Sequence, residues 1–199
     1  SIENLWSVLF TTGYLTHKGC TESGKYRLVI PNKEVRNLFV KKIREWFSDV
    51  SRNDGKTLET LCSALVNKEP EKIGQIFGDY LWNTISIRDT AAARERKENF
   101  YHGILLGLLG YKSDWLIKSN AESGIGYSDI LVEVPTNRTG IVIEIKYAED
   151  GNLDAACEKA LKQIEEKDYV AKLKQDGMKN FIKYGVACFK KVCKVVVEG

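Results

Sequence analysis

The chain has 199 residues, of which 43% are hydrophobic, 29% charged and 10% aromatic. This composition excludes an intrinsically disordered chain, and the length allows one large domain or two small ones. The formal net charge of +3 does not by itself indicate a nucleic-acid partner. Five scattered cysteines and two histidines suit neither a secreted disulfide framework nor a closed zinc site, so we expect reduced thiols.

No segment has the composition of a membrane span or of a secretion signal. The longest apolar stretch, residues 103–111, is less than half of the roughly 20 residues that a helix needs to cross a bilayer. Residues 1–15 lack the basic start and the cleavage site of a signal peptide. We therefore expect a cytoplasmic protein without a membrane partner.

Residues 1–87 are predicted to be mostly helical with one β-hairpin. Two strand-like runs flank a polar, glycine-bearing connection and predict the hairpin, with arms at 14–17 and 26–30. Apolar periodicity predicts the helices, over residues 2–10, 33–48, 57–66 and 70–82. This order is compatible with a winged-helix-like module.

The pattern changes after residues 86–93, which have little apolar periodicity, so we expect a second domain over residues 88–199. A helix is predicted first, then three strands, a charged helix and two closing strands. Their ranges are 94–109, then 115–119, 128–134 and 140–148, then 153–173, and finally 184–189 and 192–197. The order predicts a mixed α/β domain.

Two glycine-containing sequences imitate nucleotide-binding motifs. Residues 19–25 match G-x-x-x-x-G-K, but Tyr26 stands where a Ser or Thr hydroxyl should reach magnesium, and a strand-like run follows. After Gly124-x-Gly126, Asp129 occupies the position of the third glycine of a dinucleotide-binding motif. We expect a plain hairpin turn at 19–25 and no dinucleotide site at 124–129.

Two carboxylates and one lysine are predicted to share a sheet face. The two-residue period of a strand puts Glu144 and Lys146 on one face of residues 140–148. The short connection after residues 128–134 predicts antiparallel pairing, which brings Asp129 beside Glu144. Close carboxylates repel each other unless a cation lies between them, and Mg²⁺ prefers carboxylate, water and phosphate oxygens. A lysine there can activate water or offset phosphoryl charge, which indicates phosphodiester hydrolysis.

Each candidate also has an ordinary structural interpretation. A Glu-x-Lys pair is common on exposed strand faces. Glu98 and His102 share a face of the predicted helix 94–109 with the start of an apolar stripe. Glu98 can instead be an acid that favours the helix dipole, and His102 a hydrogen-bonded packing residue. Gln163, on the predicted helix 153–173, can be an exposed glutamine.

Five segments in a fixed order carry a family resemblance, namely residues 98–109, 119–129, 144–146, 160–164 and 184–189. Together they resemble the PD-(D/E)xK nuclease-like domain, in the version found at the C-terminus of bacterial AAA-type ATPase-like proteins. The resemblance covers residues 94–199, and residues 1–85 look like the helical linking region of the same proteins. It implies that this chain is the C-terminal part of a longer, ATPase-linked protein.

The resemblance also implies a fold and a set of site residues. The fold is a restriction-endonuclease-like mixed sheet with an αβββαβ core. Asp129 and Glu144 are implied as ligands of Mg²⁺ or Mn²⁺, and Lys146 as the catalytic lysine. Glu98 is implied as an auxiliary acid and Gln163 as a supporting residue.

We therefore expect a divalent-metal-dependent nuclease domain that acts on nucleic acid, with DNA as the expected substrate. The alternative is a non-catalytic nucleic-acid-binding or regulatory module of an AAA-type ATPase. The intact set of Asp129, Glu144 and Lys146 favours the enzyme. The near-neutral charge balance favours the module, as does Tyr127, which stands where many relatives carry an arginine.

Overall fold

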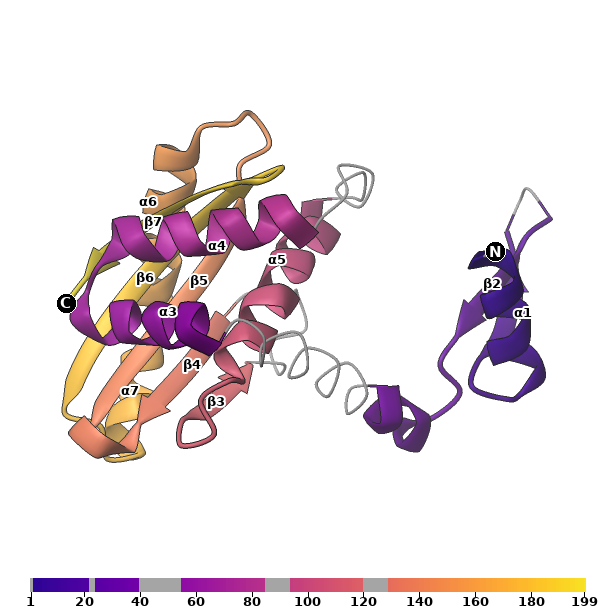
Figure 1. Ribbon diagram of the computed structural model, residues 1–199, viewed down its shortest axis with the longest axis horizontal. Coiled ribbons are helices and arrows are strands. Elements are labelled where there is room, and N and C mark those ends of the chain that lie inside the picture. The colour runs from indigo at the N-terminus through magenta and orange to yellow at the C-terminus, as the bar shows by residue number, and fades with distance from the viewer. Residues whose placement is uncertain (1, 22–23, 40–54, 85–93, 120–128) are drawn as a thin grey trace. The chain divides into compact units, whose positions relative to one another are not determined.

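The computed structural model describes residues 2–21, 24–39, 55–84, 94–119 and 129–199 (Figure 1). The chain forms two compact units, residues 1–49 and residues 50–199. Within the described residues, no helix is both long enough and apolar enough to span a membrane.

The first unit contains helix α1 (Ile2–Thr11) and a hairpin of strands β1 (Thr16–Cys20) and β2 (Tyr26–Val29). The hairpin is confirmed, although its first strand runs to Cys20 instead of ending at residue 17. Strand β2 begins directly after Lys25, where a phosphate-binding loop would need a helix. Gly24 has a φ of 76°, and its N–H donates to the Thr21 carbonyl at 2.9 Å, as in an ordinary turn. The backbone is helical over residues 33–39, and the rest of the helix predicted to residue 48 lies outside the described residues.

The second unit is built on a five-stranded sheet in the order β3-β4-β5-β6-β7. Strands β5 and β6 are parallel, and all other neighbouring pairs are antiparallel. The strands are β3 (Leu116–Ser119), β4 (Asp129–Val134), β5 (Thr139–Tyr147), β6 (Asn180–Phe189) and β7 (Val192–Glu198). The predicted α/β fold class is confirmed.

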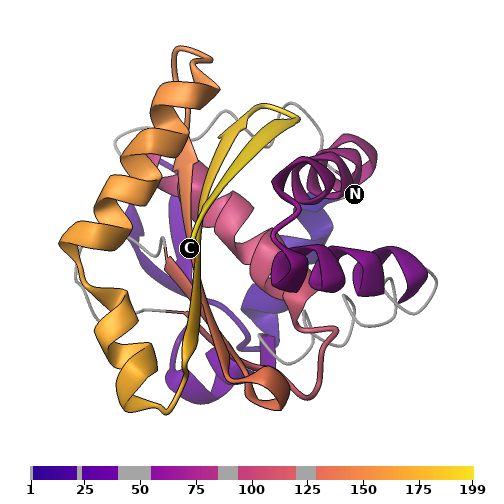
Figure 2. The ribbon, with the colours of Figure 1, turned by 90° about the vertical axis from the view of Figure 1, so that its left-hand side faces the viewer.

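Helices cover both faces of this sheet (Figure 2). Helices α3 (Gly55–Asn67), α4 (Pro70–Thr84) and α5 (Arg94–Leu109) lie on one side. Helices α6 (Leu153–Glu166) and α7 (Tyr169–Gln175), which connect β5 to β6, lie on the other. Alternate strand residues face the two layers: Ile130, Ile141, Ile143 and Tyr184 face the first, and Leu131 and Val142 face the second.

The single helix predicted over residues 153–173 is wrong, because α6 and α7 are separate. Asp168, between them, has a φ of 47°, a left-handed conformation that ends a helix and that aspartate tolerates better than most residues. The turn lets α7 pack its Leu173 against the same sheet face as α6. The apolar periodicity of the sequence continues from α6 into α7, so it did not predict the break between the two helices.

The domain boundary predicted at 87/88 lies outside the described residues and stays a prediction. Helices α3 and α4, which precede it, belong to the same compact unit as the sheet. The Tyr184 hydroxyl on β6 donates a hydrogen bond to the Leu65 carbonyl of α3 at 2.7 Å. These helices therefore form part of the core that positions the candidate site.

Candidate active site

Strands β4 and β5 pair in the predicted register. The Cα atoms of Asp129 and Glu144 are direct partners across this antiparallel pair. The connection between the strands is a short 3₁₀ turn, Pro135–Asn137, followed by Arg138 with a φ of 53°. A short connection allows few alternative pairing registers of the two strands. The turn therefore places Asp129 opposite Glu144.

Glu144 is the one charged residue at a fully buried position of β5, with 0% of its surface exposed. Strand β5 is central in the sheet and is rich in β-branched residues, which favour strands. Helices cover both of its faces. The interpretation of Glu-x-Lys as an exposed surface pair is therefore wrong, because the side chain of Lys146 is also only 12% exposed.

The carboxylate of Glu144 has one ion-pair partner among the side chains that the structure describes. Lys146 Nζ lies 2.6 Å from its Oε1 atom as an ion pair. In the described part of the chain, no donor is aligned to form a hydrogen bond with either carboxylate oxygen. A buried carboxylate normally has its lone pairs satisfied. This donor-poor carboxylate, opposite the backbone of Asp129, fits a divalent cation that takes oxygen ligands.

Glu98 reaches the same place from helix α5. Its Oε1 atom accepts a hydrogen bond from the Tyr147 backbone N–H at 3.2 Å, and its Oε2 atom lies 4.0 Å from Lys146 Nζ. The ammonium of Lys146 thus has two carboxylates beside it, at 2.6 and 4.0 Å. The interpretation of Glu98 as an acid that favours the helix dipole does not explain these contacts with β5. The structure brings Glu98, Glu144 and Lys146 together.

Among the described residues, no hydrogen bond or ion pair joins His102 or Gln163 to Glu144. His102 is buried, with its Nε2 atom 3.4 Å from the Ser119 hydroxyl of β3, which fits the packing interpretation. Gln163 is half-buried on α6, and no hydrogen bond found among the described residues joins it to Glu144. Its supporting role stays a prediction.

A cavity of about 240 Å³ opens beside Lys146, between the end of β5 and the first turns of α6. The Asn152 side chain begins α6 by accepting a hydrogen bond from the Ala155 N–H at 3.1 Å. Lys159, one turn before Gln163, adds a second cation to the lining. Sequence reasoning missed Lys159, although its helical spacing from Gln163 was a usable signal. The other lining residues include Ala148, Glu149, Asp150 and Ala156.

Residues 96–198, more than half of the chain, match the family model of the PD-(D/E)XK nuclease superfamily. The chain belongs to this superfamily. No curated protein and no solved structure matches it. The order of α5, β3, β4, β5, α6 and β6 is consistent with the αβββαβ, restriction-endonuclease-like core of a PD-(D/E)XK protein. A nuclease superfamily implies nucleic acid as the class of substrate.

Proposed function

We propose that this PD-(D/E)XK protein is a divalent-metal-dependent nuclease whose active site contains Asp129, Glu144 and Lys146. The observation that supports it most is Glu144, a fully buried carboxylate with no aligned hydrogen-bond donor among the described residues and a lysine at 2.6 Å. Burying the Glu144–Lys146 ion pair costs desolvation free energy. Apolar residues of similar volume would fill the same space without this cost, so the pair indicates a function beyond packing. Membership of a nuclease superfamily supports phosphodiester hydrolysis as the reaction.

Asp129 and Glu144 are proposed to hold Mg²⁺ or Mn²⁺ with their carboxylate oxygens. A cation held there would supply positive charge beside a phosphate oxygen of the substrate. Lys146 then orients the attacking water or takes its proton, and its charge offsets the negative charge that builds on the phosphoryl group.

Glu98 is proposed as a positioning residue rather than a metal ligand. It holds the end of β5 through the Tyr147 N–H and lies beside the ammonium of Lys146. Gln163 is proposed as a supporting residue on α6. Lys159, which lines the cavity beside Lys146, is placed to meet a phosphate of the substrate.

DNA is the proposed substrate, and an AAA-type ATPase is the proposed partner, either as another part of the same protein or as a separate chain. We place this activity in the cytoplasm. The near-neutral net charge of +3 favours a second candidate, a non-catalytic regulatory module that serves such an ATPase.

The decisive experiment incubates the protein with single-stranded, duplex and branched DNA, and with RNA, in the presence of Mg²⁺ or Mn²⁺. Lys146→Ala is compared with Lys183→Ala, which removes a lysine of the neighbouring strand β6 that pairs with Glu165. We expect cleavage by the wild type and by Lys183→Ala, and a loss of cleavage in Lys146→Ala. Metal binding without cleavage of any substrate would favour the regulatory module. Cleavage restored only by an added ATPase would identify a gated nuclease.

A further inference from the structure

Two cysteines face each other across the hairpin formed by β6 and β7. The Cα atoms of Cys188 and Cys193 are direct partners, and their sulfur atoms lie 3.1 Å apart. Opposed residues of antiparallel strands have Cβ atoms about 4.5–5.5 Å apart, close to the roughly 3.5–4.5 Å of a disulfide. A movement of about 1 Å would bring the two sulfur atoms to bonding distance.

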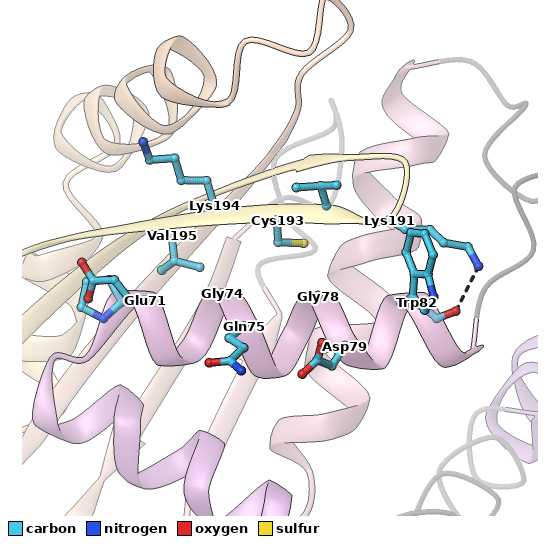
Figure 3. A pocket seen from close by; sticks show the side chains of 12 residues that line it. Glu71, Gly74, Gln75, Gly78, Asp79, Trp82, Lys191, Cys193, Lys194 and Val195 are labelled. Carbon is cyan, nitrogen blue, oxygen red and sulfur yellow. Dashed lines mark hydrogen bonds between the residues drawn. The ribbon is translucent and has the colours of Figure 1, made fainter.

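One of the two thiols is open to a groove between α4 and β7 (Figure 3). The groove has a volume of about 390 Å³, and the sulfur of Cys193 points from β7 toward α4. Gly74 and Gly78 of α4 line it, and the space where Gly78 would carry a side chain is open. A small oxidant can therefore reach Cys193 past the glycine face of α4.

The two thiols are chemically unequal. Cys188 is fully buried, and burial together with the neighbouring Cys193 thiol raises its pKa well above the usual range. Cys193 is partly exposed. Because the thiolate is the reactive form, Cys193 is the residue that meets an oxidant first, and Cys188 is the one that follows.

We propose that Cys188 and Cys193 form a reversible redox site that a hydroperoxide converts to a disulfide. The Cys193 thiolate attacks the peroxide, the O–O bond breaks, and Cys193 becomes a sulfenic acid while the leaving oxygen takes up a proton as water or an alcohol. The Cys188 sulfur then attacks the Cys193 sulfur, the S–O bond breaks, and the hydroxyl leaves as water with the Cys188 proton. A small thiol reverses the reaction by exchange.

The site lies next to the strand that carries Lys146. Cys188 is the Cα partner of Tyr147 on β5, and its carbonyl accepts a hydrogen bond from the Ala148 N–H at 2.9 Å. The proposal does not depend on nuclease activity, because it rests on two thiols and an open groove. Since the pair closes a very short loop, the bond is expected to change stability little, so it must be detected chemically.

The test treats the folded full chain with hydrogen peroxide, blocks free thiols with iodoacetamide under denaturing conditions, and digests without reduction. Trypsin cuts between the two cysteines at Lys190 and Lys191, so a disulfide leaves the two peptides linked. We expect this linked peptide, two hydrogen atoms lighter than the sum of the reduced peptides, and its loss on addition of dithiothreitol. Cys188→Ser should instead leave a Cys193 sulfenic acid that dimedone traps.

The chain contains its own controls. Burial raises the pKa of Cys62 to about 12 and that of Cys157 to about 11, so both should remain reduced. A Cys20→Ser variant removes the exposed thiol of the first unit, and the linked peptide should persist in it. Recovery of Cys188 and Cys193 as free thiols would overturn the proposal. So would sulfinic acids without the linkage, or a linkage that disappears with Cys20→Ser.

Discussion

Lys146 Nζ lies 2.6 Å from Glu144 Oε1. Both residues belong to β5, a strand that helices cover on both faces. Lys146→Ala leaves a fully buried carboxylate without its counter-ion, so we expect the free energy of unfolding without metal to fall by about 3 kcal/mol. Since a cation can replace the ammonium beside Glu144, Mg²⁺ should restore much of this loss. Urea unfolding with and without Mg²⁺ measures both effects.

Lys183→Ala is the matched control for this stability prediction. It breaks an ion pair between Lys183, whose side chain is 19% exposed, and Glu165, whose side chain is 57% exposed, so the loss should be smaller than that of Lys146→Ala and independent of Mg²⁺. Equal stability of Lys146→Ala and the wild type in the absence of metal would contradict the importance of the Lys146–Glu144 pair.

Metal binding is expected to need Asp129 and Glu144 together. Removing either leaves one carboxylate to hold a cation that releases its water reluctantly, so Asp129→Ala and Glu144→Ala should each abolish measurable Mn²⁺ binding in calorimetry. Glu133→Gln is the control, because Glu133 is a buried carboxylate of β4 that is already paired with Lys118 at 2.5 Å. Wild-type affinity in both alanine variants would place the metal elsewhere.

Catalysis should separate from binding at Lys146. At saturating Mg²⁺, Lys146→Ala should keep metal and nucleic-acid affinity, while cleavage falls by about two orders of magnitude or more. Lys146→Arg should be nearly as damaging, because a guanidinium does not lose its proton and places its charge differently. A cleavage assay paired with a binding assay on the same substrate measures this, and an active arginine variant would exclude Lys146 as a base.

Glu98 should act through Lys146 and the end of β5. Glu98→Gln keeps an acceptor for the Tyr147 N–H but removes the charge beside the ammonium, and we expect cleavage to fall about tenfold. A cleavage assay beside an unfolding measurement checks this, and wild-type cleavage by Glu98→Gln would reduce Glu98 to a structural residue.

Gly185 on β6 is the Cα partner of Glu144, and a side chain there should disturb the site. A Cβ atom at Gly185 would lie 2.6 Å from the Cys157 carbonyl oxygen of α6, so Gly185→Ala must push α6 away from the sheet. We expect a loss of about 1–3 kcal/mol in unfolding free energy. Gly103→Ala, on an exposed face of α5 with open space, should instead stabilise by about 0.5–1 kcal/mol.

Local sequence patterns predicted those features of the fold that depend on one short segment of the chain. Helix α5 has the predicted bounds, 94–109, and the Asp129–Glu144 register follows from period-two strands joined by a short connection. The grouping of Glu144 with Lys146 on one strand face also depends on nothing beyond β5 itself. These features were therefore determined by the sequence alone.

Tertiary packing decided what surrounds those residues. Strand periodicity is the same whether a face meets water or a helix, so it could not show that α6 and α7 bury the face of Glu144. The contact of Glu98 with Lys146 and Tyr147 joins residues almost fifty positions apart, and only the packing of α5 near the end of β5 brings them together. The left-handed turn at Asp168 likewise arises because α7 must return to the sheet before β6 begins.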